Sequence, residues 1–453
     1  MPLRIPDRAD VVVVGAGTAG AVAARRAAAS GARVLLVEKL PAQDVGRKIC
    51  GNAITGDGVA AIQRRVSPPS GPEVAMRIES GRIVLPDGRT ALSIPSSGLI
   101  LNRLVFGQRL VRDALDAGVE LIDECSCIGW ADRAAVKVRV RQRDGTETEI
   151  AAKVLIDATG YRGVLTRAGG PSHADALSRE QVGIGYRELA PVADPFEMPA
   201  SATIVLSPEG ARGGYGWVFP MGSRLANAGV GAPLLSAAQT IRDSFARFRE
   251  RPDGPRFLPA IDGGTGMLPL RPPVASMVGD GFLSVGDAAC QTNPLHGGGI
   301  ASSIVGGAMA GETAARVAGR RGASTGDLWS YGPAVMRELG ATHAAHDILR
   351  RFLLTLSPGD LAFLGTTLSR AGAFTALTGP SPRVQLSETM RLLAGVSARP
   401  GLALSFVRAG RLMESARRLY EGYPESPEKL DPWRRRVQAL TRAVNGLAGG
   451  MRP

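Results

Sequence analysis

Residues 10–38 read DVVVVGAGTAGAVAARRAAASGARVLLVE and contain the strongest structural signal of the chain. The apolar run at 11–14 is typical of a buried parallel strand, and it leads into a glycine-rich turn at 15–20. Good helix formers follow at 21–30, and a second apolar run occupies 34–37. The stretch therefore predicts a β-α-β unit.

The glycine pattern of this unit indicates a dinucleotide site. Gly15 permits a tight turn, Gly17 lets a pyrophosphate approach the backbone, and Gly20 lets helix and strand pack closely. Glu38 ends the second strand, where a carboxylate accepts both hydroxyls of an adenosine ribose and disfavours the 2′-phosphate of NADP. Because 58 of 453 residues are glycine, the spacing alone is weak, and a β-α turn without a ligand is the alternative.

Length and composition restrict the class of protein. A chain of 453 residues with 44% hydrophobic and 21% charged residues is expected to fold into two or three domains. No uncharged apolar stretch is long enough to span a bilayer, and the N-terminus lacks a signal-type segment. We therefore expect a cytoplasmic protein. The four cysteines show neither metal-pair nor secreted spacing, so we expect no metal site and a reducing compartment.

The net charge of +13 comes mostly from arginine, because only five of the 54 cations are lysine. These arginines are spread along the chain, which favours a solvated surface. An anionic membrane surface or a phosphate-bearing substrate is the next interpretation, and we expect no nucleic-acid partner.

The patterns along the chain predict a nucleotide-binding fold that is interrupted by a second domain. A β-hairpin is expected around residues 86–88, Pro, Gly and aromatic residues are frequent after 175, and a β-α pattern returns near 280. Helical periodicity prevails after 320. The expected segments are 8–75 (nucleotide-binding), 76–95 (hairpin of the substrate domain), 96–174 (nucleotide-binding), 175–270 (substrate-binding sheet), 271–320 (nucleotide-binding) and 321–453 (helical).

Two later segments favour FAD over NAD. Residues 156–160 (IDATG) and 282–289 (FLSVGDAA), followed by Pro294 and 297–299 (GGG), resemble the FAD proteins of the p-hydroxybenzoate hydroxylase type. The resemblance implies that Asp287 binds the ribityl chain, that the 297–299 amides face the flavin pyrimidine, and that Arg103 reaches the FAD phosphates or ring. Together with the glycine pattern, the implied cofactor-binding residues are Gly15, Gly17, Gly20, Glu38, Lys48, Cys50, Gly51, Arg103, Asp157, Gly160, Gly286, Asp287, Pro294, Gly297, Gly298, Gly299 and Ile300.

Two further motifs narrow the family. Residues 47–54 (RKICGNAI) resemble the Lys-Pro-Cys-Gly segment of geranylgeranyl reductases, and 215–220 (YGWVFP) resemble their Tyr-x-Trp-x-Phe-Pro motif. The resemblance covers roughly 8–315. It implies an α/β fold in which an FAD-binding Rossmann-type domain carries an inserted antiparallel-sheet substrate domain and a helical C-terminal region. It also implies an FAD-dependent oxidoreductase that saturates carbon–carbon double bonds of prenyl chains.

Three residues are the catalytic candidates. Tyr215 and Trp217 alternate on a strand, so both side chains project to one face and can line an apolar tunnel; two core aromatics are the alternative. Cys50 follows two cations, a setting that lowers a thiol pKa, although an inert buried thiol or a reversible link to Cys290 stays open.

The sequence leaves other functions and partners open. The alternative enzyme is an FAD-dependent hydroxylase or a halogenase, and the non-catalytic alternative is a prenyl-lipid escort protein. A reductase needs an external electron donor, such as NAD(P)H or ferredoxin, and a prenyl-lipid substrate. Such a substrate suggests peripheral membrane contact, for which Arg408, Arg411, Arg417 and Arg418 of the helical tail are the candidates.

Overall fold

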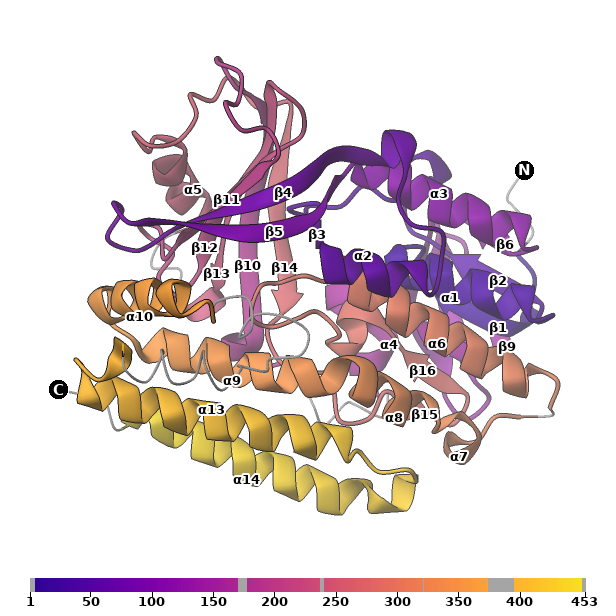
Figure 1. Cartoon of the computed structure of the whole chain (residues 1–453). Helices are drawn as coiled ribbons and strands as arrows, with labels where there is room; N and C mark the ends of the chain where they lie inside the picture. The colour runs from indigo at the N-terminus through magenta and orange to yellow at the C-terminus, as the bar shows by residue number, and fades with distance from the viewer. Residues whose placement is uncertain (1–4, 170–176, 237–239, 321, 374–394, 450–453) are drawn as a thin grey trace.

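Two β-sheets and a layer of C-terminal helices make up the molecule (Figure 1). The structure is a computed structural model that describes residues 5–169, 177–236, 240–320, 322–373 and 395–449. The domain boundaries expected at 174/175 and at 320/321 lie at positions outside the described residues. The expected fold class is confirmed: an α/β nucleotide-binding domain, a second sheet and a helical C-terminal region.

The first sheet is the core of the nucleotide-binding domain. Its strands in spatial order are β15 (Val278–Gly279), β16 (Phe282–Ser284), β9 (Glu147–Asp157), β1 (Arg8–Val14), β2 (Val34–Val37) and β6 (Glu120–Ile122). Strands β16, β9, β1, β2 and β6 run parallel. A meander of β7 (Cys125–Asp132) and β8 (Lys137–Gln142) pairs antiparallel with the first half of β9. The β-α-β unit read from the sequence is confirmed.

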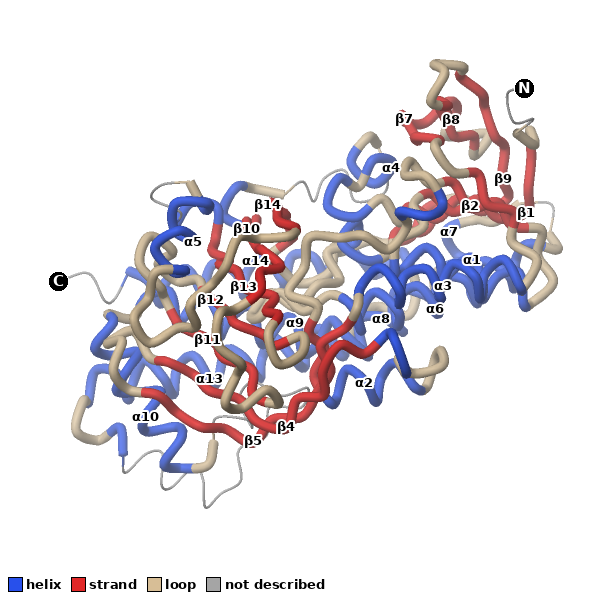
Figure 2. Tube along the Cα trace, turned by 90° about the horizontal axis from the view of Figure 1, so that it is seen from above, coloured by secondary structure: helices blue, strands red, loops and turns tan. Residues whose placement is uncertain are grey.

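Helices cover one face of this sheet and the β7–β8 meander lies on the other side (Figure 2). The helices are α1 (Thr18–Ala29), α3 (Arg103–Asp116) and α6 (Ile300–Ala318). A glycine of α6 lets its backbone lie against α1, because a Cβ at Gly307 would lie 2.3 Å from the Ala19 carbonyl oxygen. This close packing holds the N-termini of α1 and α6 in a fixed relation.

The second sheet combines segments that are far apart in the sequence. Its strands in spatial order are β14 (Asp262–Pro269), β10 (Val182–Pro191), β13 (Leu225–Pro233), β12 (Tyr215–Pro220), β11 (Ser201–Leu206), β4 (Val74–Val84), β5 (Ala91–Leu101) and β3 (Ala53–Thr55). Most pairs are antiparallel as expected, but β11 pairs parallel with β4. The hairpin predicted around residues 86–88 is the β4–β5 connection.

The C-terminal helices lie below the second sheet in Figure 1. The longer ones are α9 (Ala341–Thr355), α10 (Pro358–Ala371), α13 (Pro400–Glu421) and α14 (Leu430–Gly449). The shorter α-helices among the described residues are α2 (Gly56–Gln63), α4 (Val164–Arg167), α5 (Ile241–Arg249), α7 (Thr325–Leu328) and α8 (Tyr331–Val335). Within the described residues, every helix is too short or too polar to cross a bilayer.

Candidate FAD and substrate site

The glycine turn at 15–20 has the geometry that its sequence predicts. Gly15 has a φ of +99°, and a Cβ there would lie 2.5 Å from the Ala158 carbonyl oxygen. A Cβ at Gly20 would lie 1.8 Å from the Gly15 carbonyl oxygen. Around Gly17, the N-cap of α1, no described atom lies within 4 Å of such a Cβ. The turn is therefore tight at both ends and open in the middle, where a pyrophosphate is expected.

Glu38 lies beside this turn and is buried. One carboxylate oxygen accepts a hydrogen bond from the Ala16 backbone N–H at 2.7 Å, and the other accepts from Leu40 N–H at 3.0 Å. Glu38 therefore holds the glycine turn in place. Each carboxylate oxygen retains acceptor capacity, so ribose hydroxyls can still donate to it.

The burial and the hydrogen bonds of Arg103 show whether an anionic cofactor fits this site. It begins α3, is 7% exposed and donates from Nη2 to the Thr18 hydroxyl at 2.9 Å. Its Nε and Nη1 have no hydrogen-bond partner among the described residues. Burial lowers the pKa of Arg103, although an arginine remains a cation. A buried guanidinium with two unpartnered donors is costly alone, and the pyrophosphate of a bound FAD would supply the opposite charge and the acceptors.

Lys48 and Asp287 form an ion pair at the second cofactor segment. Lys48 Nζ lies 3.2 Å from Asp287 Oδ2, and the Thr292 hydroxyl donates to Oδ1 of the same carboxylate. Burial raises the pKa of Asp287, but the Lys48 charge and the Thr292 hydroxyl outweigh burial, so the net pKa is lowered. The Asp287 charge in turn raises the pKa of Lys48. Asp287 is therefore an ionised acceptor, as a contact to ribityl hydroxyls requires.

Asp157 has a different environment from the one expected of a cofactor ligand. It is fully buried, and its two oxygens accept five hydrogen bonds from the backbone and side chains of Thr159, Leu165 and Thr166. These hydrogen bonds show that Asp157 stabilises the turn after β9. Gly160 lies in this turn with a φ of +68° and with open space around it. Direct contact of either residue with the cofactor stays a prediction.

The loop before α6 carries the remaining cofactor candidates, including Pro294. Gly286 and Gly297 have φ values of +62° and +69°, which favour glycine. Gly299 is the N-cap of α6, which begins at Ile300, and Gly298 N–H donates to the His296 ring. Tyr215 of β12 reaches this loop, because its hydroxyl donates to the His296 carbonyl at 2.6 Å.

Trp217 meets residues 48–52, here called the Cys50 segment, on the second sheet. A Cβ at Gly51 would lie 3.5 Å from Trp217 Nε1 and 3.3 Å from the Phe219 ring. The ring centroids of Tyr215 and Trp217 are 5.9 Å apart, and those of Trp217 and Phe219 are 6.2 Å apart. The two aromatic candidates therefore project to one face, as predicted, and that face meets the Cys50 segment.

Cys50 and Cys290 are both thiols in the structure, and a reversible link between them stays a prediction. Cys50 and Cys290, both within the described residues, are not joined by a disulfide. Cys290 is buried, whereas Cys50 is only partly buried and its sulfur accepts a hydrogen bond from Asn52 N–H at 3.3 Å. Cys50 is therefore a thiol at the edge of the aromatic face.

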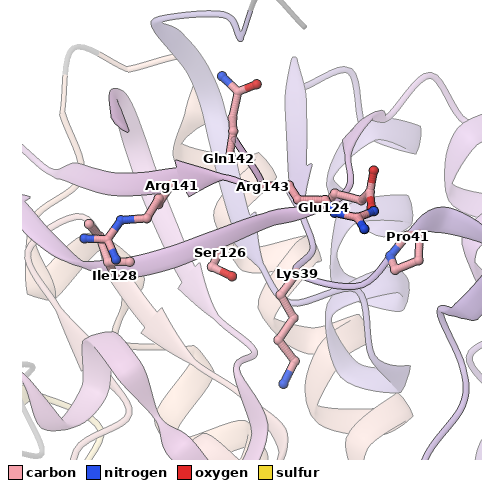
Figure 3. A pocket seen from close by; sticks show the side chains of 8 residues that line it. All are labelled: Lys39, Pro41, Glu124, Ser126, Ile128, Arg141, Gln142 and Arg143. Carbon is pink, nitrogen blue, oxygen red and sulfur yellow. The ribbon is translucent and has the colours of Figure 1, made fainter. Parts of the chain in front are cut away.

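A surface pocket of about 530 Å³ lies elsewhere, against β7 and β8 (Figure 3). Its lining residues are Lys39, Pro41, Glu124, Ser126, Ile128, Arg141, Gln142 and Arg143. None of them is a candidate site residue. Two of its cations are already paired, Arg143 with Glu124 and Arg141 with Glu147. We assign no role to this pocket.

Three residues of the site are not among the predicted site residues. Thr18 accepts from Arg103, Thr292 donates to Asp287, and Asn227 lies between Trp217 and Cys50. Thr18 sits inside the glycine pattern, and Thr292 follows Asp287 by five residues, so proximity in sequence was a usable signal. Asn227 is 177 residues from Cys50, and only the sheet pairing brings it there.

Comparisons with known proteins agree with this geometry. The family model for FAD-dependent oxidoreductases matches residues 10–217. A digeranylgeranylglycerophospholipid reductase of Sulfolobus acidocaldarius is 28% identical over 450 residues, which is 96% of this chain and 98% of that protein. A reductase of the same name from Methanopyrus kandleri is 34% identical over 319 residues, which is 67% of this chain and 80% of that protein.

Solved structures support the same fold. A geranylgeranyl bacteriochlorophyll reductase-like protein of Thermoplasma acidophilum superimposes with a TM-score of 0.76 at 22% identity, covering 89% of this chain and 99% of that one. The flavin-dependent brominase Bmp2 reaches a TM-score of 0.62 at 18% identity, covering 96% and 99%. The chain is an FAD-dependent oxidoreductase, and it belongs to the geranylgeranyl reductase family, with the digeranylgeranylglycerophospholipid reductases as its relatives.

Proposed function

We propose that this protein saturates carbon–carbon double bonds in the prenyl chains of a lipid. The observation that carries the proposal is the aromatic face of Tyr215, Trp217 and Phe219, which meets the Cys50 segment at one end and the loop before α6 at the other. The names of the relatives point to the same substrate class. When bound and reduced, FAD supplies the hydride for such a reduction.

The chain's own residues have separate tasks in this proposal. Glu38, Arg103 and Asp287 bind the cofactor along its length, and the 297–299 loop lies at its flavin end. Trp217 and Tyr215 hold an apolar chain and exclude water, which an unactivated alkene requires for close placement. Burial raises the pKa of Tyr215 to about 12, so its hydroxyl keeps its proton at neutral pH. Cys50 is our candidate for handling a proton beside the aromatic face.

A halogenase or hydroxylase is the second candidate, because halogenases share the fold. The aromatic motif favours the reductase, since a tryptophan halogenase is expected to have Trp-x-Trp-x-Ile-Pro where this chain has YGWVFP. Oxygen decides between the classes. A reductase forms its product under strict anaerobic conditions with reduced protein, whereas a hydroxylase or halogenase forms none without oxygen. The electron donor, NAD(P)H or a ferredoxin-like carrier, belongs to the proposal as a requirement of the reaction.

Peripheral membrane contact is the second part of the proposal. Arg417 and Arg418, two of the four expected cations, are paired with Glu414, and Arg417 also with Glu421, so they contribute little net charge. Arg408 and Arg411 are exposed without an ion pair among the described residues, and Leu404, 72% exposed, shares their helix face. On the neighbouring helix α14, Arg435, Arg436 and Arg442 are exposed in the same way. An anionic lipid surface fits this α13–α14 face.

Liposome binding tests this contact. We expect the protein to sediment with anionic liposomes at low salt and to be released at high salt, because each cation near the surface contributes about 1 kcal/mol that salt screens. Arg408→Gln with Arg411→Gln is expected to weaken binding. The control removes the same charge at exposed sites outside α13 and α14, with Arg89→Gln and Arg112→Gln. Equal binding by both double variants would contradict the assigned face.

A further inference from the structure

Asn227 is a buried polar residue that lies between two of the three catalytic candidates, Trp217 and Cys50. It is 0% exposed and sits on β13, where it pairs in register with Phe219 of β12. Its Oδ1 accepts from the Trp217 indole N–H at 2.9 Å, and its Nδ2 donates to the Cys50 carbonyl at 2.8 Å. An indole N–H is only a donor and a carbonyl only an acceptor, so the amide has one possible orientation.

Beyond the contact at Cys50, the Cys50 segment is attached to the sheet at Asn52, whose carbonyl accepts from the Leu101 N–H of β5 at 2.9 Å. Ile49 rests over the glycines of β14, since a Cβ at Gly264 would lie 2.8 Å from Ile49 Cδ1. Arg187 Nη2 approaches the Lys48 carbonyl, but at 3.5 Å this contact is too long to fix the segment. The Asn227 contact is short, comes from a fully buried amide and joins the Cys50 carbonyl itself to the sheet, so it fixes the position of the backbone at Cys50.

We propose that Asn227 is the positioning residue that holds the Cys50 segment in register with Trp217. The Asn227 amide bonds to both sides, so it fixes how the Cys50 segment lies relative to the aromatic face of the second sheet. Loss of the Nδ2 donor removes the hydrogen bond from the Cys50 carbonyl and loosens the backbone there. Loss of the acceptor half frees the indole.

Asn227→Asp is the informative variant, because it has nearly the same shape. As a carboxylate it still accepts from Trp217 but faces the Cys50 carbonyl with a second acceptor. Burial raises the pKa of the introduced carboxyl, and once protonated the acid has an O–H that can donate to that carbonyl. The defect should therefore be present at high pH and should recede as the pH falls. A residue that merely fills space would not confer this pH dependence.

The first readout is the rate at which iodoacetamide alkylates Cys50 in the FAD-loaded protein, measured by peptide mass spectrometry. Rates are divided by the wild-type rate at the same pH. We expect Asn227→Asp to alkylate several-fold faster at high pH and to approach the wild-type rate at low pH. Asn227→Leu, which lacks both hydrogen bonds, should alkylate faster at every pH.

The second readout is turnover, and only this arm rests on the proposed function. We expect Asn227→Asp to lower kcat by about tenfold at high pH, as the loss of one buried hydrogen bond implies, with little change in flavin reduction by dithionite. Trp217→Phe tests the other half of the bridge and should lower kcat without the pH-dependent recovery. Ser244→Ala is the matched control, because Ser244 is a buried residue of α5 whose hydroxyl donates to the Gly210 carbonyl, away from the Cys50 segment.

The outcomes separate the two proposals. Faster alkylation with pH-dependent recovery supports the positioning role even if no alkene is reduced, in which case the proposed function fails. An alkylation ratio for Asn227→Asp that is flat with pH, or equal to that of Ser244→Ala, overturns the positioning role. If Asn227→Leu does not fold, the Asn227→Asp profile still decides.

Discussion

Replacing Arg103 with Met is expected to weaken FAD binding by more than tenfold and, at the same time, to stabilise the flavin-free protein. The cofactor loses one or two charge-assisted hydrogen bonds, each worth about 1.5 to 3 kcal/mol. The flavin-free protein loses a buried guanidinium whose Nε and Nη1 have no partner among the described residues. Removing an uncompensated buried charge outweighs the single hydrogen bond to Thr18.

Flavin release on dilution and the Tm of the flavin-free protein measure these two effects. Arg112→Met, at an exposed position on the same helix, is the control and should change neither. A lower Tm for flavin-free Arg103→Met together with unchanged FAD affinity would mean that Arg103 is an ordinary structural cation.

The glycine turn gives the second large effect, as a contrast between two alanine substitutions. Gly20→Ala places a methyl group 1.8 Å from the Gly15 carbonyl oxygen, so α1 cannot keep its place and the protein should lose both stability and FAD. Gly17→Ala meets no described atom within 4 Å. The second variant should fold normally and still bind FAD poorly, because its methyl group occupies the approach of the pyrophosphate.

Circular dichroism and bound-flavin absorbance distinguish these results. Normal folding with no flavin in Gly17→Ala locates the cofactor at this turn. Full flavin occupancy in that variant would place the pyrophosphate elsewhere.

Local patterns were sufficient to predict much of this molecule. The apolar strands, the glycine turn and the turn residues at 86–88 each act within a few residues, so the β-α-β unit and the β4–β5 hairpin were predictable. The parallel pairing of β4 with β11 was not, because it joins strands more than a hundred residues apart and leaves no local signature.

The same limit applies to the site. The motifs identified Lys48, Asp287, Arg103 and Trp217 as separate candidates. They did not predict which residues each of these would contact. The Lys48–Asp287 ion pair spans 239 residues and the Arg103–Thr18 hydrogen bond spans 85. Asn227 was overlooked for the same reason, since an asparagine within an apolar strand acquires a meaning only from its partners across the sheet.

The most direct test of the proposed function is mass spectrometry of a lipid that carries two geranylgeranyl chains, after anaerobic incubation with the dithionite-reduced protein. Each saturated double bond adds two hydrogens, so the account predicts products heavier by multiples of about two mass units. Lipid incubated with oxidised protein is the control and should keep its mass. An unchanged lipid mass with fully reduced, FAD-loaded protein, or a product that forms only when oxygen is admitted, would contradict the account.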